Sequence, residues 1–94
     1  MGQENLPKYS LLFSNKAFKF LEGLDATTRN RVMADIDGLR NFPFFDSSLD
    51  VAKLRGEKDY YRLRTGKIRT IFNVDKSGEI ILVRKVAYRE QAYE

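Results

Sequence analysis

The stretch Tyr60–Arg69 constrains the fold more than any other part of this sequence. It reads as two alternating strands joined at Gly66-Lys67, and a two-residue connection of this kind is typical of a β-hairpin. Side chains alternate along a strand and directly opposite residues share a face, so one face is apolar and the other carries arginines. The predicted register pairs Thr65 with Ile68, Arg64 with Arg69, Leu63 with Thr70, Arg62 with Ile71 and Tyr61 with Phe72.

The basic face of this hairpin holds Arg62, Arg64 and Arg69. Like charges directly opposite each other on two strands destabilise a sheet. A bound anion would offset that repulsion, so we predict an anion site on this face. The alternative is a solvated basic surface with no partner, which is the usual explanation of a surface arginine taken singly.

The composition excludes several kinds of site. The 94 residues include no cysteine and no histidine, which removes disulfides, thiolate ligands, the usual general base and the commonest metal ligand. We therefore expect no metal site and no cofactor. The net charge is +4, and residues 52–94 hold 11 basic and 6 acidic residues against 6 and 7 in residues 1–51. This asymmetry favours a polyanion or an acidic protein as partner.

The length is that of a single domain, residues 1–94, with a modest core. Residues 1–7 read as a flexible leader without an apolar signal core, and no apolar run approaches the length of a membrane span. We expect a cytoplasmic protein with no membrane contact.

The first half of the chain predicts a strand at residues 8–13 followed by two helices. Ser14 is positioned to cap the first helix, and Asp25 or Thr27 the second. Apolar residues recur at helical spacing in both helices, and the polar residues of the second helix are expected in solvent. The apolar positions are Ala17, Phe18, Leu21 and Leu24, then Val32, Ile36 and Leu39; the solvent positions are Arg29, Arg31, Asp35 and Asp37. Three phenylalanines at positions 42, 44 and 45 are expected to fill the core.

The second half changes to a period of two. Strands are predicted at residues 51–54, 60–65, 68–74 and 79–86, with a turn at residues 75–78. The expected fold is α+β: an N-terminal strand, an antiparallel helical hairpin, and a three- to four-stranded antiparallel sheet covered by the helices on one face. If Val74 pairs with Glu79, Arg69 lies opposite Arg84 and the basic row crosses three strands.

The basic face of the hairpin is suited to binding RNA, which is a polyanion. Cleavage through the 2′-hydroxyl of RNA needs no metal, but it needs phosphate stabilisation and two proton transfers. Arginine binds phosphate oxygens bidentately and stays charged, so it suits the first task and not the second. The candidates for proton transfer are Tyr93, Tyr88, Tyr60, Lys53, Lys85 and Glu90.

Three motifs together resemble the RelE toxin family, within the RelE/ParE superfamily of toxin–antitoxin systems. They are Lys53-Leu54-Arg55-Gly56, Tyr61-Arg62-Leu63-Arg64, and Gly66–Phe72 followed by an apolar strand and the segment Tyr88-Arg89 to Tyr93. The resemblance covers residues 9–93 and includes the order of the elements. It implies a RelE/ParE-like fold and a toxin that cuts mRNA in the ribosomal A site without metal, inhibiting translation. It also implies a RelB-like antitoxin as partner, beside the ribosome and mRNA.

The resemblance also suggests roles for individual residues. By position, Arg62, Arg64, Arg69 and Arg89 match residues that bind phosphate or stabilise the transition state, and Tyr93 matches a tyrosine that stacks on a base and helps to activate the 2′-hydroxyl. Further RNA contacts are assigned to Lys53, Arg55, Arg84, Lys85 and Tyr88. Many relatives carry lysine at the positions of Arg62 and Arg64, which leaves the general acid open here.

Two alternatives remain from the sequence. A ParE-like gyrase inhibitor shares the fold, although the arginine row is unusual for that branch. A binding module without catalysis would use the same basic face and bind nucleic acid in a salt-dependent way.

Overall fold

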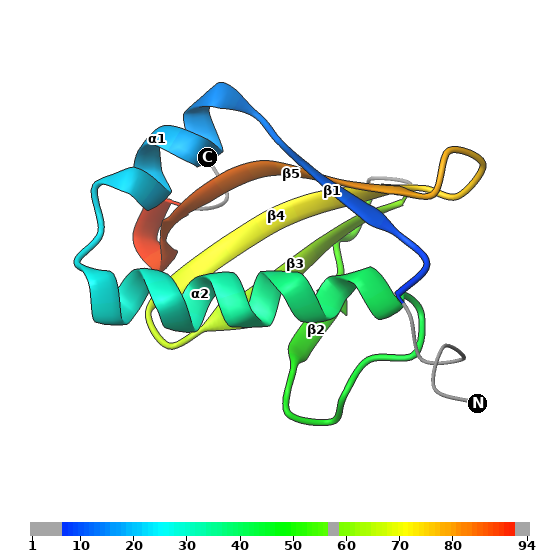
Figure 1. Cartoon of the computed structure of the whole chain (residues 1–94), viewed down its shortest axis with the longest axis horizontal. Coiled ribbons are helices and arrows are strands. Elements are labelled where there is room, and N and C mark those ends of the chain that lie inside the picture. The colour runs from blue at the N-terminus through cyan, green and yellow to red at the C-terminus, as the bar shows by residue number, and fades with distance from the viewer. Residues whose placement is uncertain (1–6, 57–58, 92–94) are drawn as a thin grey trace.

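The computed structural model describes residues 7–56 and 59–91, and its elements follow the predicted α+β order (Figure 1). A strand and two helices come first, then four strands. The elements are β1 Ser10–Phe13, α1 Asn15–Glu22, α2 Ala26–Gly38, the 3-10 turn η2 Leu39–Asn41, β2 Asp50–Lys53, β3 Tyr60–Thr65, β4 Ile68–Asp75, β5 Ile80–Tyr88 and the 3-10 turn η3 Arg89–Gln91.

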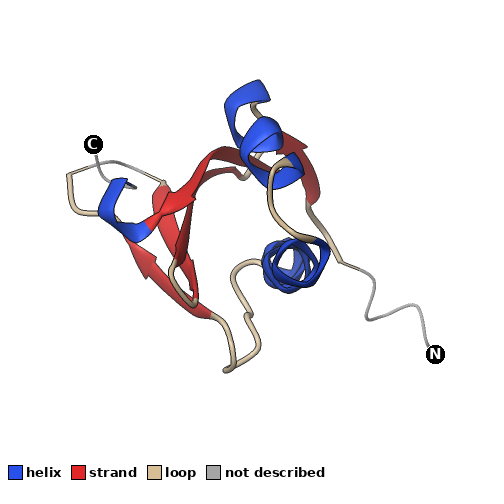
Figure 2. Ribbon diagram, turned by 90° about the vertical axis from the view of Figure 1, so that its left-hand side faces the viewer, coloured by secondary structure: helices blue, strands red, loops and turns tan. Residues whose placement is uncertain are grey.

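The strands form one five-stranded sheet in the order β1-β5-β4-β3-β2. The four strands β2 to β5 pair antiparallel with their neighbours, as predicted. The N-terminal strand adds a parallel edge, with Ser10 opposite Ile80 and Phe13 opposite Val83. A parallel pairing requires a crossover connection, and here α1 and α2 lie within that crossover. Figure 2, which looks along α2, shows the sheet curving around one side of this helix.

Both helices begin at the predicted caps. The Ser14 hydroxyl accepts a hydrogen bond from the Ala17 N–H at 3.0 Å, and the Asp25 carboxylate accepts one from the Thr28 N–H at 3.1 Å. These bonds satisfy backbone donors that have no partner within the helix. The remaining choice between Asp25 and Thr27 is thereby decided in favour of Asp25.

The core lies between the helices and the apolar face of the sheet. The predicted stripe of α2 is completely buried, since Val32, Ile36 and Leu39 have no exposed surface. Leu63 and Phe72 meet this stripe from β3 and β4 and are equally buried. The hairpin therefore uses its apolar face as predicted.

Two of the predicted core residues lie at the surface. Phe18 is 53% exposed and Phe44 is 83% exposed, whereas Phe42 is buried against the rings of Tyr9 and Tyr61. Both predictions are wrong. For Phe18, helical spacing overestimated the buried face of a helix of only eight residues. Phe44 lies in the connection between η2 and β2, where its side chain faces solvent. None of the described helices is both long and apolar enough to cross a membrane.

Candidate functional site

The hairpin of β3 and β4 has the predicted register at every pair. Arg64 lies opposite Arg69, and Thr65 lies opposite Ile68 beside the turn. Gly66 has a φ of +59°, a left-handed conformation that residues with a Cβ rarely adopt. The sequence Gly66-Lys67 therefore fixes the tight turn, and the turn fixes the facing arginines.

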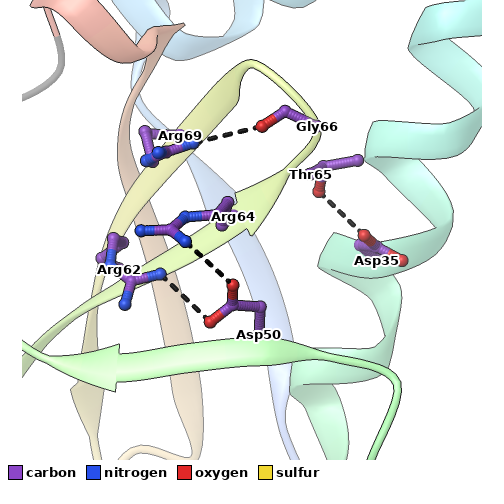
Figure 3. Close-up of polar contacts among 7 residues, drawn as sticks. All are labelled: Asp35, Asp50, Arg62, Arg64, Thr65, Gly66 and Arg69. Atoms are coloured by element: carbon purple, nitrogen blue, oxygen red, sulfur yellow. Dashed lines mark hydrogen bonds and ion pairs between the residues drawn. The ribbon is translucent and has the colours of Figure 1, made fainter.

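Arg62 and Arg64 share one carboxylate that sequence reasoning missed. Nη1 of Arg62 lies 3.3 Å from Oδ1 of Asp50, and Nη1 of Arg64 lies 3.5 Å from Oδ2 of the same residue (Figure 3). Asp50 is the first residue of β2 and lies directly opposite Arg64. The sequence does contain a signal for this contact, because Asp50 is an acidic residue at the start of a strand next to the arginine strand. The contact itself could not be predicted, because it depends on the register between β2 and β3.

Arg69 is buried rather than open to solvent. Only 5% of its surface is exposed, and its Nη1 donates a hydrogen bond to the Gly66 carbonyl oxygen at 3.2 Å (Figure 3). The guanidinium thereby lies at the hairpin end of the sheet, beside the turn. A buried arginine is unusual in a small domain, because removing a charge from water is unfavourable unless the charge is compensated.

The predicted pairing of Arg69 with Arg84 is wrong. Arg69 lies opposite Ala87, and the β4–β5 register shifts between Ile71 and Phe72. Ile71 pairs with Lys85 and Phe72 pairs with Val83, so Arg84 is the extra residue of a bulge. The bulge accounts for one of the three positions between Arg84 and Ala87. The other two come from the turn, since Val74 pairs with Ile81 rather than with Glu79 as predicted. Sequence patterning sets the strands but not their register, because both faces of β5 carry apolar residues.

Arg84 and Lys85 nevertheless remain near the basic face. The guanidinium carbon of Arg84 lies 5.8 Å from the centre of the Tyr60 ring, a cation–π distance. Lys85 occupies the same cross-strand row as Arg62, through Ile71 between them. The basic residues therefore continue along the sheet from the hairpin end towards Tyr60.

Three other predicted RNA contacts lie elsewhere. Lys53 is opposite Tyr61, whose ring stacks on Phe72 in the core, so its register places it on the helix side. Arg55 is exposed and follows β2, away from the hairpin turn. Tyr88 contacts the Phe20 ring at 5.4 Å, also on the helix side. These three side chains do not join the arginines of the hairpin.

The C-terminal segment approaches the hairpin turn. The Arg89 N–H donates a hydrogen bond to the Lys67 carbonyl oxygen at 2.8 Å, which holds the start of η3 against the turn. Arg89 itself is exposed. Tyr93, the remaining predicted catalytic residue, lies outside the described residues.

A polar contact fixes the hairpin to α2. The Thr65 hydroxyl donates a hydrogen bond to Oδ2 of Asp35 at 2.8 Å, on the side of the strand opposite to the arginines (Figure 3). Asp35 is half-buried, so the prediction that it faces solvent is wrong. Next to this contact, a groove of about 400 Å³ runs between α2 and the turn and is lined by Arg31, Lys67 and Tyr88 among others.

The arrangement suits the binding of a phosphate group. Arg62 and Arg64 are partly exposed and Arg69 is buried, and all three lie on one sheet face towards the hairpin end. Each can present a planar pair of N–H donors to phosphate oxygens. Within residues 7–56 and 59–91, no group of three acidic residues lies close enough together to hold a metal ion.

Comparison with known proteins gives consistent matches over nearly the whole chain. The chain is 29% identical over 87 residues to a Methanocaldococcus jannaschii protein named RelE1, covering 93% of this chain and 97% of the relative. It is 29% identical over 85 residues to the protein named Toxin RelE3 of the same organism, covering 89% and 94%. No family model matches the chain.

Solved structures agree. A chain of the archaeal RelE–RelB complex from Pyrococcus horikoshii OT3 superposes with a TM-score of 0.76 at 29% identity, covering 90% of this chain and 99% of that chain. In sequence and in fold, this chain is similar to RelE toxins. The isolated Escherichia coli RelE toxin has the same fold, with a TM-score of 0.74 at 23% identity over 90% of this chain and 88% of that one. The five-stranded sheet with its N-terminal strand and two helices is thus the RelE architecture.

Proposed function

We propose that this chain is the toxin of a type II toxin–antitoxin system and a ribosome-dependent mRNA endonuclease. In this proposal it cuts the codon in the ribosomal A site by attack of the RNA's own 2′-hydroxyl, without a metal ion, and so inhibits translation in the cytoplasm. Two relatives bear RelE names, and several of the matched structures are complexes of RelE with RelB. A RelB-like antitoxin is accordingly the proposed resting partner.

The observation that carries the proposal is the placement of three arginines on one face of one hairpin. Arg62 and Arg64 reach the same point beside β2, as their shared contact with Asp50 demonstrates. Arg69 faces Arg64 across the two strands. In the proposed complex, Arg62 and Arg64 bind the non-bridging oxygens of the scissile phosphate.

Arg69 is the proposed stabiliser of the transition state. Negative charge accumulates on the phosphoryl oxygens when the 2′-hydroxyl attacks. Arg69 is a buried residue, and a guanidinium with little water around it interacts more strongly with that charge than an exposed one, because less water screens it. Its hydrogen bond to the Gly66 carbonyl holds it in place before the substrate arrives.

Proton transfer has to come from other groups. Arginine does not release its proton at neutral pH, so the hairpin is a poor general acid or base. We assign this role to the segment after β5, where Arg89 is tied to the turn and Tyr93 follows four residues later. A tyrosine needs a cationic neighbourhood to act as a base at neutral pH, and Arg89 and the arginines of the hairpin are the groups proposed to supply it.

The test is Arg64→Gln, chosen because Arg64 is partly exposed, so its replacement spares the core. Purified protein is added to a translating extract and the mRNA ends are mapped. We expect the rate of cleavage to fall by about 10²-fold, the usual loss for one donor to a developing oxyanion. The control is Lys76→Gln, which removes one positive charge from the exposed turn after β4 and should cut like the wild type.

The outcomes separate the proposal from its rivals. Equal cleavage by Arg64→Gln and the wild type refutes the arginine site. Damaged DNA with intact mRNA supports a gyrase inhibitor instead. Intact mRNA and intact DNA, with salt-dependent RNA binding, support a binding module without catalysis.

A further inference from the structure

Asp50 is the one acidic side chain that the described ion pairs place among the arginines of the hairpin. Its two oxygens contact two different guanidiniums, Oδ1 that of Arg62 and Oδ2 that of Arg64 (Figure 3). The register explains this bridge. Arg64 is the direct cross-strand partner of Asp50, while Arg62 faces the short side chain of Ala52 and reaches Asp50 along the diagonal.

The bridge resembles the contact that a phosphodiester group makes. A carboxylate and a phosphodiester each carry one negative charge, and each offers two equivalent oxygens on one atom. Both bind guanidinium groups through those oxygens. The position of the Asp50 carboxylate is therefore one that an RNA phosphate needs if it is to bind Arg62 and Arg64 together.

The contact is also weak enough to exchange. The side chains of Asp50 and Arg64 are 49% and 46% exposed, and exposed ion pairs add little to stability because water and salt screen them. Arg62 is better covered, at 15% exposure, so its side chain has less room to move than that of Arg64 when the carboxylate leaves. An incoming phosphate thus meets arginines that are already directed to one point.

We propose that Asp50 is a built-in competitor of the RNA phosphate, which occupies Arg62 and Arg64 in the free toxin and sets its affinity for RNA. The inference rests on the proposed function, since it takes RNA as the ligand of this face. It assigns to Asp50 the role of lowering affinity for RNA in solution. Tight binding of RNA then requires additional contacts, either with other parts of the protein or with the ribosome.

The test measures binding, without ribosomes, of a short single-stranded 2′-O-methyl oligonucleotide, which has no free 2′-hydroxyl and is not cut. Asp50→Asn removes the charge and nearly preserves the shape. We expect it to bind about tenfold more tightly than the wild type at low salt, because two guanidiniums lose their internal anion. Asp50→Ser, with a shorter side chain, should tighten binding in the same direction.

The salt dependence gives a second readout, which a merely structural role of Asp50 would not change. In the wild type the phosphate exchanges with a carboxylate, whereas in Asp50→Asn it meets two uncompensated charges. The slope of log affinity against log salt should therefore be steeper in the variant by about 0.7, the value of one phosphate contact with a single strand.

Asp37→Asn is the matched control. Asp37 pairs with Arg40 at the same 3.3 Å distance and is 65% exposed, but it lies near the end of α2. Asp37→Asn changes the net charge by the same amount as Asp50→Asn, but away from the arginines of the hairpin. Its affinity for the oligonucleotide should therefore stay within about twofold of that of the wild type. In an Arg64→Gln background the effect of Asp50→Asn should fall to about threefold or less, because one of its two partners is gone.

Three results would overturn the inference: equal effects of Asp50→Asn and Asp37→Asn, weaker binding by Asp50→Asn, or an undiminished effect in the Arg64→Gln background. Cleavage on ribosomes by the wild type tests the proposed function separately. Cleavage without tighter binding by Asp50→Asn refutes only the role of Asp50. Tighter binding without cleavage refutes only the endonuclease.

Discussion

The contact between Thr65 and Asp35 predicts a measurable difference between two buried threonines. Thr65 donates its hydroxyl to Asp35 at 2.8 Å and is only 9% exposed. The hydroxyl of Thr70, which is 1% exposed, has no hydrogen-bond partner among the described residues. Replacing each threonine by valine removes the hydroxyl and keeps a branched side chain of similar size.

The two substitutions should change stability in opposite directions. A hydrogen bond to a charged acceptor contributes about 1.5–3 kcal/mol, and the lower end applies here because Asp35 is only half-buried. We therefore expect Thr65→Val to lower the free energy of unfolding by about 1.5 kcal/mol. Thr70→Val removes an unpaired buried hydroxyl and should leave this free energy unchanged or raise it by up to about 1 kcal/mol.

Urea and thermal denaturation followed by circular dichroism measure both variants. For a domain of this size, a loss of 1.5 kcal/mol lowers the melting temperature by about 6–12 °C. Asp35→Ala should destabilise the protein similarly, and Thr65→Val should add little in that background, since the same bond is already lost. Equal destabilisation by Thr65→Val and Thr70→Val would refute the stabilising role of the Thr65–Asp35 hydrogen bond, because packing alone would then explain both effects.

Two further predictions concern the core edge and the helix cap. Phe42→Ala should lower the free energy of unfolding by about 3–5 kcal/mol, because it empties a site between the rings of Tyr9 and Tyr61. Phe44→Ala, at an 83% exposed position, should change it by no more than about 0.5 kcal/mol. Urea denaturation measures both variants, and similar losses would contradict the assigned burial. Hydrogen bonds from the side chain and then the backbone of Thr28 hold the pKa of Asp25 below its usual 3.8, so the stability that its charge contributes is complete above that pH and is lost as pH falls through the lowered pKa. The stability difference between the wild type and Asp25→Ser, which keeps a cap but does not titrate, should shrink on acidification below about pH 4, and a growing difference would reverse the assigned direction.

Local patterning was sufficient for most of the fold. The caps at Ser14 and Asp25, the stripe of α2 and the register of the hairpin all follow from interactions between residues close in sequence. Such interactions act within one helix or one turn, so the interacting residues lie close together in the sequence. The parallel pairing of β1 with β5 joins residues about 70 positions apart and had no local signal.

The candidate site was predictable in part for the same reason. Arg62, Arg64 and Arg69 lie on one tight hairpin, whose turn residues determine their relation. The other charged residues near these arginines come from different strands. Asp50 joins them through the register of β2, and Arg84 is displaced from the row by a bulge in β5.

The sequence by itself thus determined a hairpin with an apolar and a basic face, because Gly66-Lys67 favours a tight turn and the strands alternate on either side of it. Only the tertiary structure decided how charged that basic face is in the free protein. It buries Arg69, sets the carboxylate of Asp50 between Arg62 and Arg64, and ties the other side of the hairpin to α2 through Asp35. These contacts depend on register and packing between distant segments, where small differences in energy select one arrangement among several that the pattern allows.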